Sequence, residues 1–600
     1  MPPNRRHQGI GTKPPKVDNV LSTVLRIWTY MAGEKKRFIA IVSLVVISSL
    51  LSLIGPYLLG RAVDAVIADP MTKTLIVMVS ILLFVYVMHA IATWLQNYWM
   101  IGLAQDTVYL IRNHLFSHLQ RLPILFFQKR QQGDLMSRLT NDIENISRTL
   151  NSAVIQFTTS VLTIAGTIGM MIWLSPILTL LTLTIVPIMY FGMKWITKRT
   201  SIFFKQQQKQ LGDMNGYAEE MFSGHQIIKM YSQEQRVMEE FAQQNKSLRE
   251  ASYWAQTYSG FIPKLMNMLN NVSFAIIVGA GGLLALNGLV SIGVIVTFTT
   301  YSRQFTRPLN DLANQYNMIL SAVAGAERVF QIIDEQEESS RDKTVSVPEK
   351  VRGDVTFESV DFSYDEGQPI LKNISFHASQ GETIALVGPT GAGKTTIISL
   401  LSRFYDHDQG KILVDGADIQ TIDREQIRKQ MGVVLQDSML FHKTIRENIR
   451  YGRLDATDDE VEKVAKAAHA HEFIMKLPEG YETILDSDGK GISHGQRQLL
   501  SIARAMLADP ALLILDEATS SIDTVTEMKI KDAIDTLMEG RTSFVIAHRL
   551  NTIRNADCIL VLHNGEIIEK GSHRELMNRR GYYADLVQAQ VSDAKVTSNM

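Results

Sequence analysis

Four long stretches without any Asp, Glu, Lys or Arg dominate the first half of the chain: Phe38–Leu59, Thr74–Gln105, Thr149–Met193 and Leu265–Ser302. A helix rises about 1.5 Å per residue, so the shortest stretch already covers about 33 Å, enough to cross about 30 Å of hydrocarbon. Ser175-Pro176 divides the third stretch and Asn287-Gly288 divides the fourth, because such pairs end helices. We therefore expect about six membrane-spanning helices.

The expected membrane region covers residues 17–330. It begins with a helix at 17–33 lying on the membrane surface, since Leu21, Val24, Leu25 and Trp28 share one side. Residues 1–16 are basic, without an early apolar core, and are expected to be a cytoplasmic tail rather than a cleaved signal. The six spans are expected at approximately 38–59, 74–105, 149–174, 176–199, 261–286 and 289–330.

The connections between the spans alternate in length. The two long loops, 106–148 and 194–264, carry many Lys and Arg residues, and basic loops remain in the cytoplasm. We therefore expect a multi-pass protein of the cytoplasmic membrane, with both termini and the following domain in the cytoplasm. Helical spacing of apolar residues from Leu103 to Leu119 predicts that part of the first loop is helix extending out of the bilayer.

The absence of charge within these stretches argues against proton coupling and against a strictly ionic cargo, because charges at membrane depth usually mark ion pathways. Hydrogen bonds between helices explain the uncharged polar residues better than ligand contacts do: His89, Gln96, Asn97, Asn267, Asn270 and Asn271. Several aromatic and Met residues could line a drug-accepting cavity, although most are expected to pack or face lipid: Trp94, Tyr98, Met170, Met171, Trp173, Met266 and Met268.

The second half of the 600-residue chain has a different composition. Residues 331–350 are acidic and rich in Ser, as expected of a linker, and residues 351–590 alternate short strands with helices, before a tail at 591–600. The net charge of -1 gives no indication of nucleic-acid binding. The lone Cys558 lies in an apolar run, and we expect a core residue rather than a reactive thiol.

A glycine-rich loop at Gly388–Thr395 stands between an apolar strand, Thr383–Val387, and a helix starting at Lys394. This context is that of a phosphate-binding loop, in which backbone N–H groups and the helix N-terminus face phosphate. Lys394 would hold the β- and γ-phosphates of ATP, and Thr395 would bind Mg²⁺. The predicted nucleotide-binding residues of the loop are Gly388, Pro389, Thr390, Gly391, Ala392, Gly393, Lys394, Thr395 and Thr396.

Two carboxylates follow the wholly apolar run Ala511–Leu515, which reads as a central parallel strand. Asp516 at the strand end can bind the Mg²⁺ shell, and Glu517 can polarise the attacking water. Phosphoryl transfer needs chiefly positioning and charge neutralisation from the protein. The sequence therefore predicts an enzyme that hydrolyses ATP with Mg²⁺.

These motifs resemble the ATP-binding cassette (ABC) family, over almost the whole chain. The resemblance implies a six-helix membrane domain followed by an α/β P-loop domain with an inserted helical subdomain. It also implies roles for four residues. Tyr364 would stack on adenine, and Gln436 would sense Mg²⁺ and link motor to membrane domain. Asp523 would lie in a loop crossing the dimer interface, and His548 would contact the γ-phosphate.

In this family two cassettes pair head to tail, and each ATP lies between one glycine-rich loop and the partner's signature, usually Leu-Ser-Gly-Gly-Gln. Here the signature is Ile-Ser-His-Gly-Gln, with Ser493, Gly495 and Gln496 in place and His494 where a glycine is usual. Asp486-Ser487 likewise replace a usual Gly-Glu pair. His494 is either a tolerated variant or a sign of functional degeneration, and the drift of the neighbouring loop favours degeneration.

One cassette behind one membrane domain resembles a half-transporter of the bacterial multidrug exporter type. The simplest way to combine intact hydrolytic residues with a degenerate signature is a heterodimer, in which this chain supplies Glu517 and a non-identical partner supplies the sound signature. The expected cargo is small, hydrophobic or amphipathic, and reached from membrane lipid. A lipid flippase, or an ATP-gated sensor or channel without transport, remains an alternative.

The long loops also match the exporter pattern, at Gly133–Asp142 and Gly216–Tyr231. We expect short helices near 137–144 and 213–221 to dock on the cassettes and transmit movement.

Overall fold

The computed structural model describes residues 20–68, 72–338, 351–364, 367–435, 439–486, 491–516, 523–546 and 550–588. The chain forms two compact units. The helical unit comprises residues up to 122 together with 130–336, and the α/β unit comprises 123–129 together with the residues from 337 onward.

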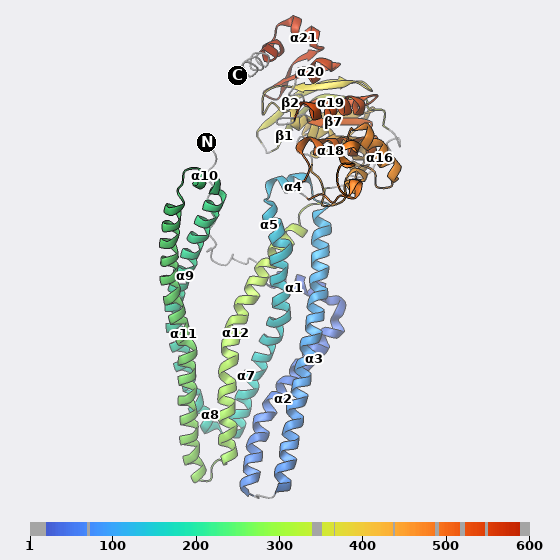
Figure 1. Ribbon diagram of the computed structural model, residues 1–600. Coiled ribbons are helices and arrows are strands. Elements are labelled where there is room, and N and C mark those ends of the chain that lie inside the picture. The colour runs from blue at the N-terminus through green and yellow to red at the C-terminus, as the bar shows by residue number, and fades with distance from the viewer. Residues whose placement is uncertain are drawn as a thin grey trace. The chain divides into compact units, whose positions relative to one another are not determined.

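Long helices build the helical unit (Figure 1). They are α1 (Val20–Met31), α2 (Lys35–Ala68), α3 (Thr72–Leu119), α7 (Val154–Leu174), α8 (Pro176–Leu183), α9 (Ile185–Ser223), α11 (Glu234–Leu286) and α12 (Ile292–Ile333). Shorter helical segments are a 3₁₀ turn (Ala32–Glu34), α5 (Gln132–Ser137), a π-helix (Arg138–Asp142), α6 (Ile143–Arg148), a second π-helix (Thr149–Ala153) and α10 (His225–Met230).

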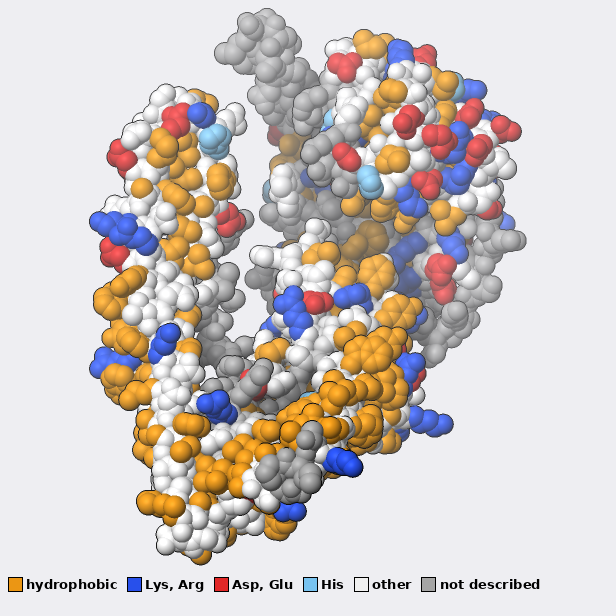
Figure 2. Space-filling model, turned by 60° about the horizontal axis from the view of Figure 1, so that its bottom comes forward, with side chains coloured by type: hydrophobic (Ala, Val, Ile, Leu, Met, Phe, Trp, Pro, Cys, Tyr) orange, Lys and Arg blue, Asp and Glu red, His pale blue; other side chains and the backbone are white. Residues whose placement is uncertain are grey.

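Five helical segments of the described chain are long and apolar enough to cross a membrane: Val20–Ala68, Lys73–Leu119, Gln132–Leu174, Pro176–Ser223 and Glu234–Leu286. Apolar side chains cover much of the helical surface seen in Figure 2, while charged side chains gather on the α/β unit. The helix of the second span continues into the first long loop, as expected, because α3 runs unbroken to Leu119. Leu103, Ile111 and Leu115 form its buried stripe.

The expected sixth span is not among these five segments. The charge-free part of α12 ends at Ser302, about 16 Å after the helix begins, which is too short to cross the bilayer as an apolar segment. The helix instead packs against α2, α7 and α11. Polar residues are tolerated in such a position because neighbouring helices shield them from lipid.

The short helices of the two long loops lie elsewhere than predicted. Residues 213–221 lie inside α9, and residues 138–142 are a π-helix between α5 and α6. The separate short helices are α4 (Ile124–Lys129), which follows Pro123, and α10, which follows Gly224. Pro123 cannot continue the hydrogen-bonding of α3, and Gly224 ends α9, so the chain changes direction at both points. Separate short helices at 137–144 and 213–221 are therefore not what the structure shows, while docking of the two loops on the cassettes stays a prediction.

The surface helix α1 presents the predicted apolar side. Leu21 is 74 % exposed and Leu25 is 55 % exposed, while Ile27 and Met31 are buried against the unit. On the same helix, the guanidinium of Arg26 bonds the carboxylate of Asp334 at 2.5 and 2.7 Å and lies 4.3 Å from the ring centroid of Phe330. The pair holds the pKa of Asp334 below its usual value. The Arg26–Asp334 pair therefore connects α1 to the end of α12.

A second ion pair joins α12 to the first loop. Arg328 donates to the Asp142 carboxylate at 2.8 Å through Nε, and Asp142 has only 7 % of its side chain exposed. Arg130 adds a bond of 2.7 Å to Glu335, just after α12 ends. The last turns of α12 are therefore held by charge pairs to the segment that follows α4.

Two sheets form the α/β unit. Their strands are β1 (Val355–Ser363), β2 (Pro369–Ala378), β3 (Thr383–Val387), β4 (Gln409–Val414), β5 (Ala417–Asp418), β6 (Met431–Val434), β7 (Leu512–Asp516), β8 (Thr542–Ile546), β9 (Cys558–His563) and β10 (Glu566–Gly571). The first sheet has the order β2-β1-β4-β5 and is antiparallel. The second has the order β10-β9-β3-β8-β7-β6, parallel except for β10 at its edge. Cys558 is buried, which confirms the core assignment.

The helices of the α/β unit lie around and between these strands: α4, α13 (Lys394–Leu401), α14 (Arg424–Lys429), α15 (Ile445–Arg450), α16 (Asp458–Ala467), α17 (His471–Ile474), a 3₁₀ turn (Gly480–Glu482), α18 (His494–Ala508), α19 (Thr524–Met538), α20 (Leu550–Asn555) and α21 (His573–Arg579). Between β6 and β7 the chain is helical, as the resemblance implies for an inserted subdomain.

Replacement of Arg328 by Met should destabilise the helical unit, because it leaves the Asp142 carboxylate buried and unpaired. Since Arg328 itself is 39 % exposed, we expect a loss of about 2 kcal/mol rather than the full value of a buried pair. The double variant Asp142→Asn/Arg328→Met should recover more than half of the loss. Thermal unfolding in detergent measures both.

Arg148→Met serves as the control, since the Arg148–Glu144 pair lies on the surface, 69 % and 50 % exposed. If the double variant is no more stable than the single one, the unpaired charge is not the cause.

Candidate nucleotide-binding site

Three neighbouring strands place the phosphate loop and the acidic strand end at one edge of the parallel sheet. Leu386 of β3 is paired with Ile546 of β8, and Ile546 is paired with Asp516 of β7. The carboxyl ends of β3 and β7 therefore lie at the same level, one strand apart. Ligands of open α/β sheets bind at this edge.

The glycine-rich loop that follows β3 depends on the absence of side chains. Gly388 and Gly393 have φ values of +154° and +103°. A Cβ on Gly388 would lie 2.2 Å from the carbonyl oxygen of Leu562, and one on Gly393 would lie 2.5 Å from a methyl group of Leu371. The loop therefore packs directly on neighbouring chain segments, which keeps its curved backbone in place.

Lys394 begins α13 and is 8 % exposed. Its ammonium donates to the carbonyl oxygens of Gly388 at 2.7 Å and Pro389 at 2.9 Å, so it lies over the loop. Burial lowers the pKa of Lys394, and the nearby charge of Asp516 partly offsets this effect. A buried cation beside exposed backbone N–H groups at a helix N-terminus suits the phosphates of ATP.

The remaining ligands of the expected Mg²⁺ ion fit the same edge. Thr395 follows Lys394 with its side chain exposed, and Asp516 ends β7 half-buried. Hydroxyl and carboxylate oxygens are the ligands that Mg²⁺ prefers, and the ion neutralises charge on the transferring phosphoryl group when bound. Thr395 and Asp516 would hold it.

Tyr364 contacts α13, the helix that follows the phosphate loop. Its hydroxyl shares a hydrogen bond of 3.2 Å with the hydroxyl of Thr396, and its ring meets those of Phe362 and Tyr405 edge to face, at 4.9 and 5.0 Å between centroids. This places the predicted adenine-stacking ring next to the nucleotide loop. Stacking on adenine stays a prediction.

The predicted catalytic residues Gln436, Glu517 and His548 lie outside the described residues. In the sequence, however, each follows a strand of the same sheet closely: Gln436 comes two residues after β6, Glu517 directly after β7 and His548 two residues after β8. All three strands run parallel to β3. Their roles stay predictions.

The signature begins α18. Ser493 caps this helix by accepting from the N–H of Gln496 at 3.2 Å, and the Gln496 side chain accepts from the N–H of Ser493 at 2.9 Å. Gly495 is buried, and His494 occupies the first helical turn, half-buried. Within the described residues no hydrogen bond or ion pair joins Ser493–Gln496 to Gly388–Thr396 of the same chain. The phosphate loop and the signature of one chain are therefore not joined to each other by these bonds.

Asp523 also acts as a helix cap. Its carboxylate accepts from the N–H of Thr526 at 2.9 Å at the start of α19, and this backbone hydrogen bond lowers the pKa of Asp523. This capping role explains an acidic residue at position 523 without reference to a partner chain. Its predicted place in an interface loop therefore stays open.

The structure adds one residue that the sequence did not indicate, Tyr405. Its hydroxyl donates to the side-chain oxygen of Gln128 in α4, the short helix of the first loop. Ile124 and Leu125 of α4 pack against the core of the α/β unit. A continuous set of contacts therefore runs from Thr396 through Tyr364 and Tyr405 to α4. Only the three-dimensional structure brings residues 128 and 405 together, since nothing in either local sequence predicts the pairing.

Comparison with known proteins finds two family models, one for the membrane part of the chain and one for the nucleotide-binding part. The model of the ABC transporter transmembrane region matches residues 38–309, and the ABC transporter model matches residues 371–520. The chain is 56 % identical to the ABC transporter ATP-binding protein YfiC of Bacillus subtilis over 96 % of its own length and 95 % of that protein. The chain belongs to the ABC transporter family.

Two further relatives have names that state a cargo. The chain is 42 % identical to a fatty acid ABC transporter ATP-binding/permease protein of Mycobacterium bovis, over 85 % of the chain and 80 % of that protein. It is 34 % identical to the putative multidrug export ATP-binding/permease protein YgaD of Bacillus subtilis, over 95 % of the chain and all of that protein. This ABC protein therefore joins a membrane region to an ATPase that drives export, in the arrangement of a half-transporter.

Replacement of Tyr405 by Phe should weaken the coupling between ATP hydrolysis and transport, because it removes the hydrogen bond to Gln128 and keeps the ring. We expect ATP hydrolysis to continue while the amount of cargo moved per ATP falls at least threefold. Parallel ATPase and vesicle transport measurements give this ratio.

Tyr582→Phe is the control, because Tyr582 also lies in the α/β unit and its side chain takes no part in the contacts between Thr396, Tyr364, Tyr405 and α4. An unchanged transport-to-ATPase ratio in Tyr405→Phe would exclude the contact as part of the coupling.

Proposed function

We propose that this half-transporter exports small hydrophobic or amphipathic compounds across the cytoplasmic membrane as one half of a heterodimer. ATP binding would draw two α/β units together, and hydrolysis through Glu517 would reset the transporter. The observation that carries the proposal is the shared edge of β3, β8 and β7, which sets Lys394 near Asp516 in a chain that also carries membrane-spanning helices. Two similar proteins are named as a fatty acid transporter and as a putative multidrug exporter, and these names support an amphipathic cargo.

The need for a second subunit is supported by the tip of the second loop. Around α10, Phe222, Ile227, Met230 and Tyr231 are between 63 % and 79 % exposed. A cluster of large apolar side chains at the end of a long charged hairpin favours contact with protein. We propose that this tip binds the α/β unit of the partner chain.

A non-identical partner is supported by His494. Its side chain occupies the first turn of α18, where N–H groups face a ligand, and the imidazole Nδ1 is buried without a hydrogen-bond partner in the described residues. A bulky ring there hinders the close approach that a glycine allows. A partner with an intact signature would then complete the active site at Lys394 and Glu517, while His494 would face a second, slow site.

Glu517→Gln should abolish ATP turnover in the assembled transporter and leave ATP binding in place, because the amide keeps the shape but cannot accept a proton from water. Release of inorganic phosphate and retention of labelled ATP measure the two effects. Glu539→Gln, at an exposed position after α19, is the control. Normal turnover in Glu517→Gln would show that another group activates the water.

His494→Gly should raise the ATPase activity of this chain purified alone at least tenfold, because both sites of a homodimer carry the same obstruction. His573→Gly is the matched control, since His573 also begins a helix behind a capping serine, far from the signature in sequence. Full activity of the unmodified single chain would contradict the heterodimer proposal.

A further inference from the structure

The helical unit contains a cavity of about 570 Å³ between α2, α3, α7 and α12. Of the residues that line it, only Ile155 and Pro308 are apolar. Its size falls within the range of sites for drug-sized ligands, but such sites are usually lined mainly by apolar groups. A polar lining inside a membrane unit indicates that the ligand brings a polar group of its own.

The cavity lies deep along the helices. Ser48 of α2 is about 20 Å from the first residue of that helix, and Arg303 is about 16 Å from the first residue of α12. Both positions therefore lie about three turns or more inside these long helices. Arg303 lies within the expected span 289–330, directly after the charge-free stretch that ends at Ser302. The argument against an ionic cargo was drawn from the charge-free stretches, so it does not extend to this cavity.

Some of the uncharged polar residues join helices by hydrogen bonds, as expected from the sequence, and also line the cavity. Ser48 donates to Gln96 at 3.0 Å, and His89 lies 3.0 Å from the carbonyl oxygen of Ser48, so α2 and α3 are joined by hydrogen bonds. The same three side chains line the cavity. Interhelical bonding and exposure to a ligand are therefore compatible here.

Several residues that line the cavity have a buried side-chain oxygen without a hydrogen-bond partner within the described residues. These oxygens belong to Ser49, Thr93, Thr159, Ser160 and Gln304. Ser49 and Ser160 are only 3 % and 1 % exposed. A buried polar group without a partner typically costs about 1–3 kcal/mol, so the four hydroxyls among these oxygens favour a ligand group that accepts their hydrogens, whereas the Gln304 amide oxygen can only accept.

The two charged residues of the cavity differ in their surroundings. The carboxylate of Asp311 accepts from the amide of Gln156 at 3.0 Å. For Arg303, the structure gives no hydrogen bond or ion pair to the described residues, and its guanidinium lies 5.7 Å from the ring centroid of Phe274. Among the described residues neither charge has an ion pair, but Asp311 has a hydrogen-bond partner and Arg303 has none.

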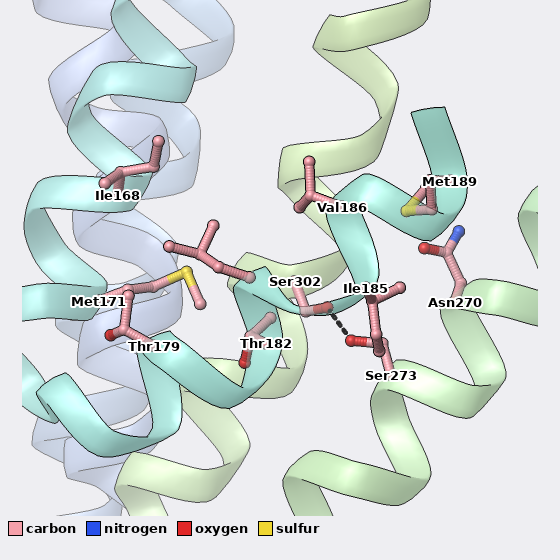
Figure 3. A pocket seen from close by; sticks show the side chains of 11 residues that line it. Ile168, Met171, Thr179, Thr182, Ile185, Val186, Met189, Asn270, Ser273 and Ser302 are labelled. Carbon is pink, nitrogen blue, oxygen red and sulfur yellow. Dashed lines mark hydrogen bonds between the residues drawn. The ribbon is translucent and has the colours of Figure 1, made fainter. Parts of the chain in front are cut away.

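Packing of the neighbouring residue fixes the direction of Arg303. Ser302 bonds Ser273 of α11 at 2.8 Å in a closely packed region beside Met171, Ile185 and Met189, shown in Figure 3. The free volume there is only about 20 Å³, too small for a ligand. Because consecutive helical residues point about 100° apart, a buried Ser302 turns Arg303 towards another face of α12.

We propose that this cavity binds an amphipathic carboxylate, with its head group on Arg303 and on the unpaired Ser and Thr hydroxyls. A guanidinium binds a carboxylate through two parallel hydrogen bonds, and one such group matches a single negative charge. A phosphate monoester would bring about two charges to a cavity that offers one free cation among the described residues and already holds Asp311. The inference rests on the proposed export function and names the class of its cargo.

The test uses the assembled transporter in phosphatidylcholine vesicles. Three fluorescent probes with the same C16 chain are compared: a free carboxylate, its methyl ester and a phosphodiester lipid. In the unmodified protein we expect ATP-driven transport of the carboxylate to exceed that of the ester at least tenfold. Arg303→Gln should lower the carboxylate-to-ester ratio at least tenfold, and Arg303→Lys should lower it less, because Lys keeps the charge but not the paired hydrogen bonds.

Arg148→Gln is the control variant, since Arg148 is exposed on α6 and does not line the cavity, and it should keep the ratio. Equal transport of carboxylate and ester by the unmodified protein, or preference for the phosphodiester, would overturn the inference while leaving export intact. An equal fall for all probes in Arg303→Gln would also overturn it, by showing a structural role. Failure of the unmodified protein to move any probe would instead overturn the export function.

Discussion

The parallel alignment of β3, β8 and β7 is the constraint on which the catalytic half of this ABC protein depends. The three strands are almost fully buried, and their pairing sets Leu386, Ile546 and Asp516 in one row. A shift of one residue in either pairing would separate the phosphate loop from the acidic strand end and turn buried side chains outward. The geometry for phosphate and metal is therefore a consequence of core packing.

From this edge, contacts lead to α4, the short helix of the first loop. The contacts run from Thr396 to Tyr364, then to Tyr405, and finally to Gln128 in α4. Helix α4 belongs to the α/β unit, although the residues before and after it in the chain belong to the helical unit. The end of α12 is held separately, through Arg26–Asp334 and Arg328–Asp142. The end of α12 is thus attached to the segment that follows α4, and transmission of movement through α4 stays a prediction.

The helical unit shows how a polar cavity can exist within a membrane protein. Its backbone groups are satisfied inside the long helices, as lipid requires, so polar side chains can be turned inward without exposing an unpaired main chain. Serine, threonine and glutamine residues of α2, α3, α7 and α12 gather around Arg303, and apolar side chains cover the outside. The cavity can therefore offer hydrogen-bonding groups inside the helical unit.

Much of this was determined by sequence alone, because it depends on local patterns: the long apolar stretches, the helical continuation of α3, the phosphate loop between strand and helix, and the exposed apolar side of α1. Tertiary structure decided what depends on distant residues. The sequence showed where the charge-free part of α12 ends, but it could not show that Arg303 lines a cavity between α2, α3, α7 and α12. The position of α4 and its bond to Tyr405 join residues 277 positions apart. Periodicity describes which side of a helix is apolar, but only packing selects the neighbour that this side meets.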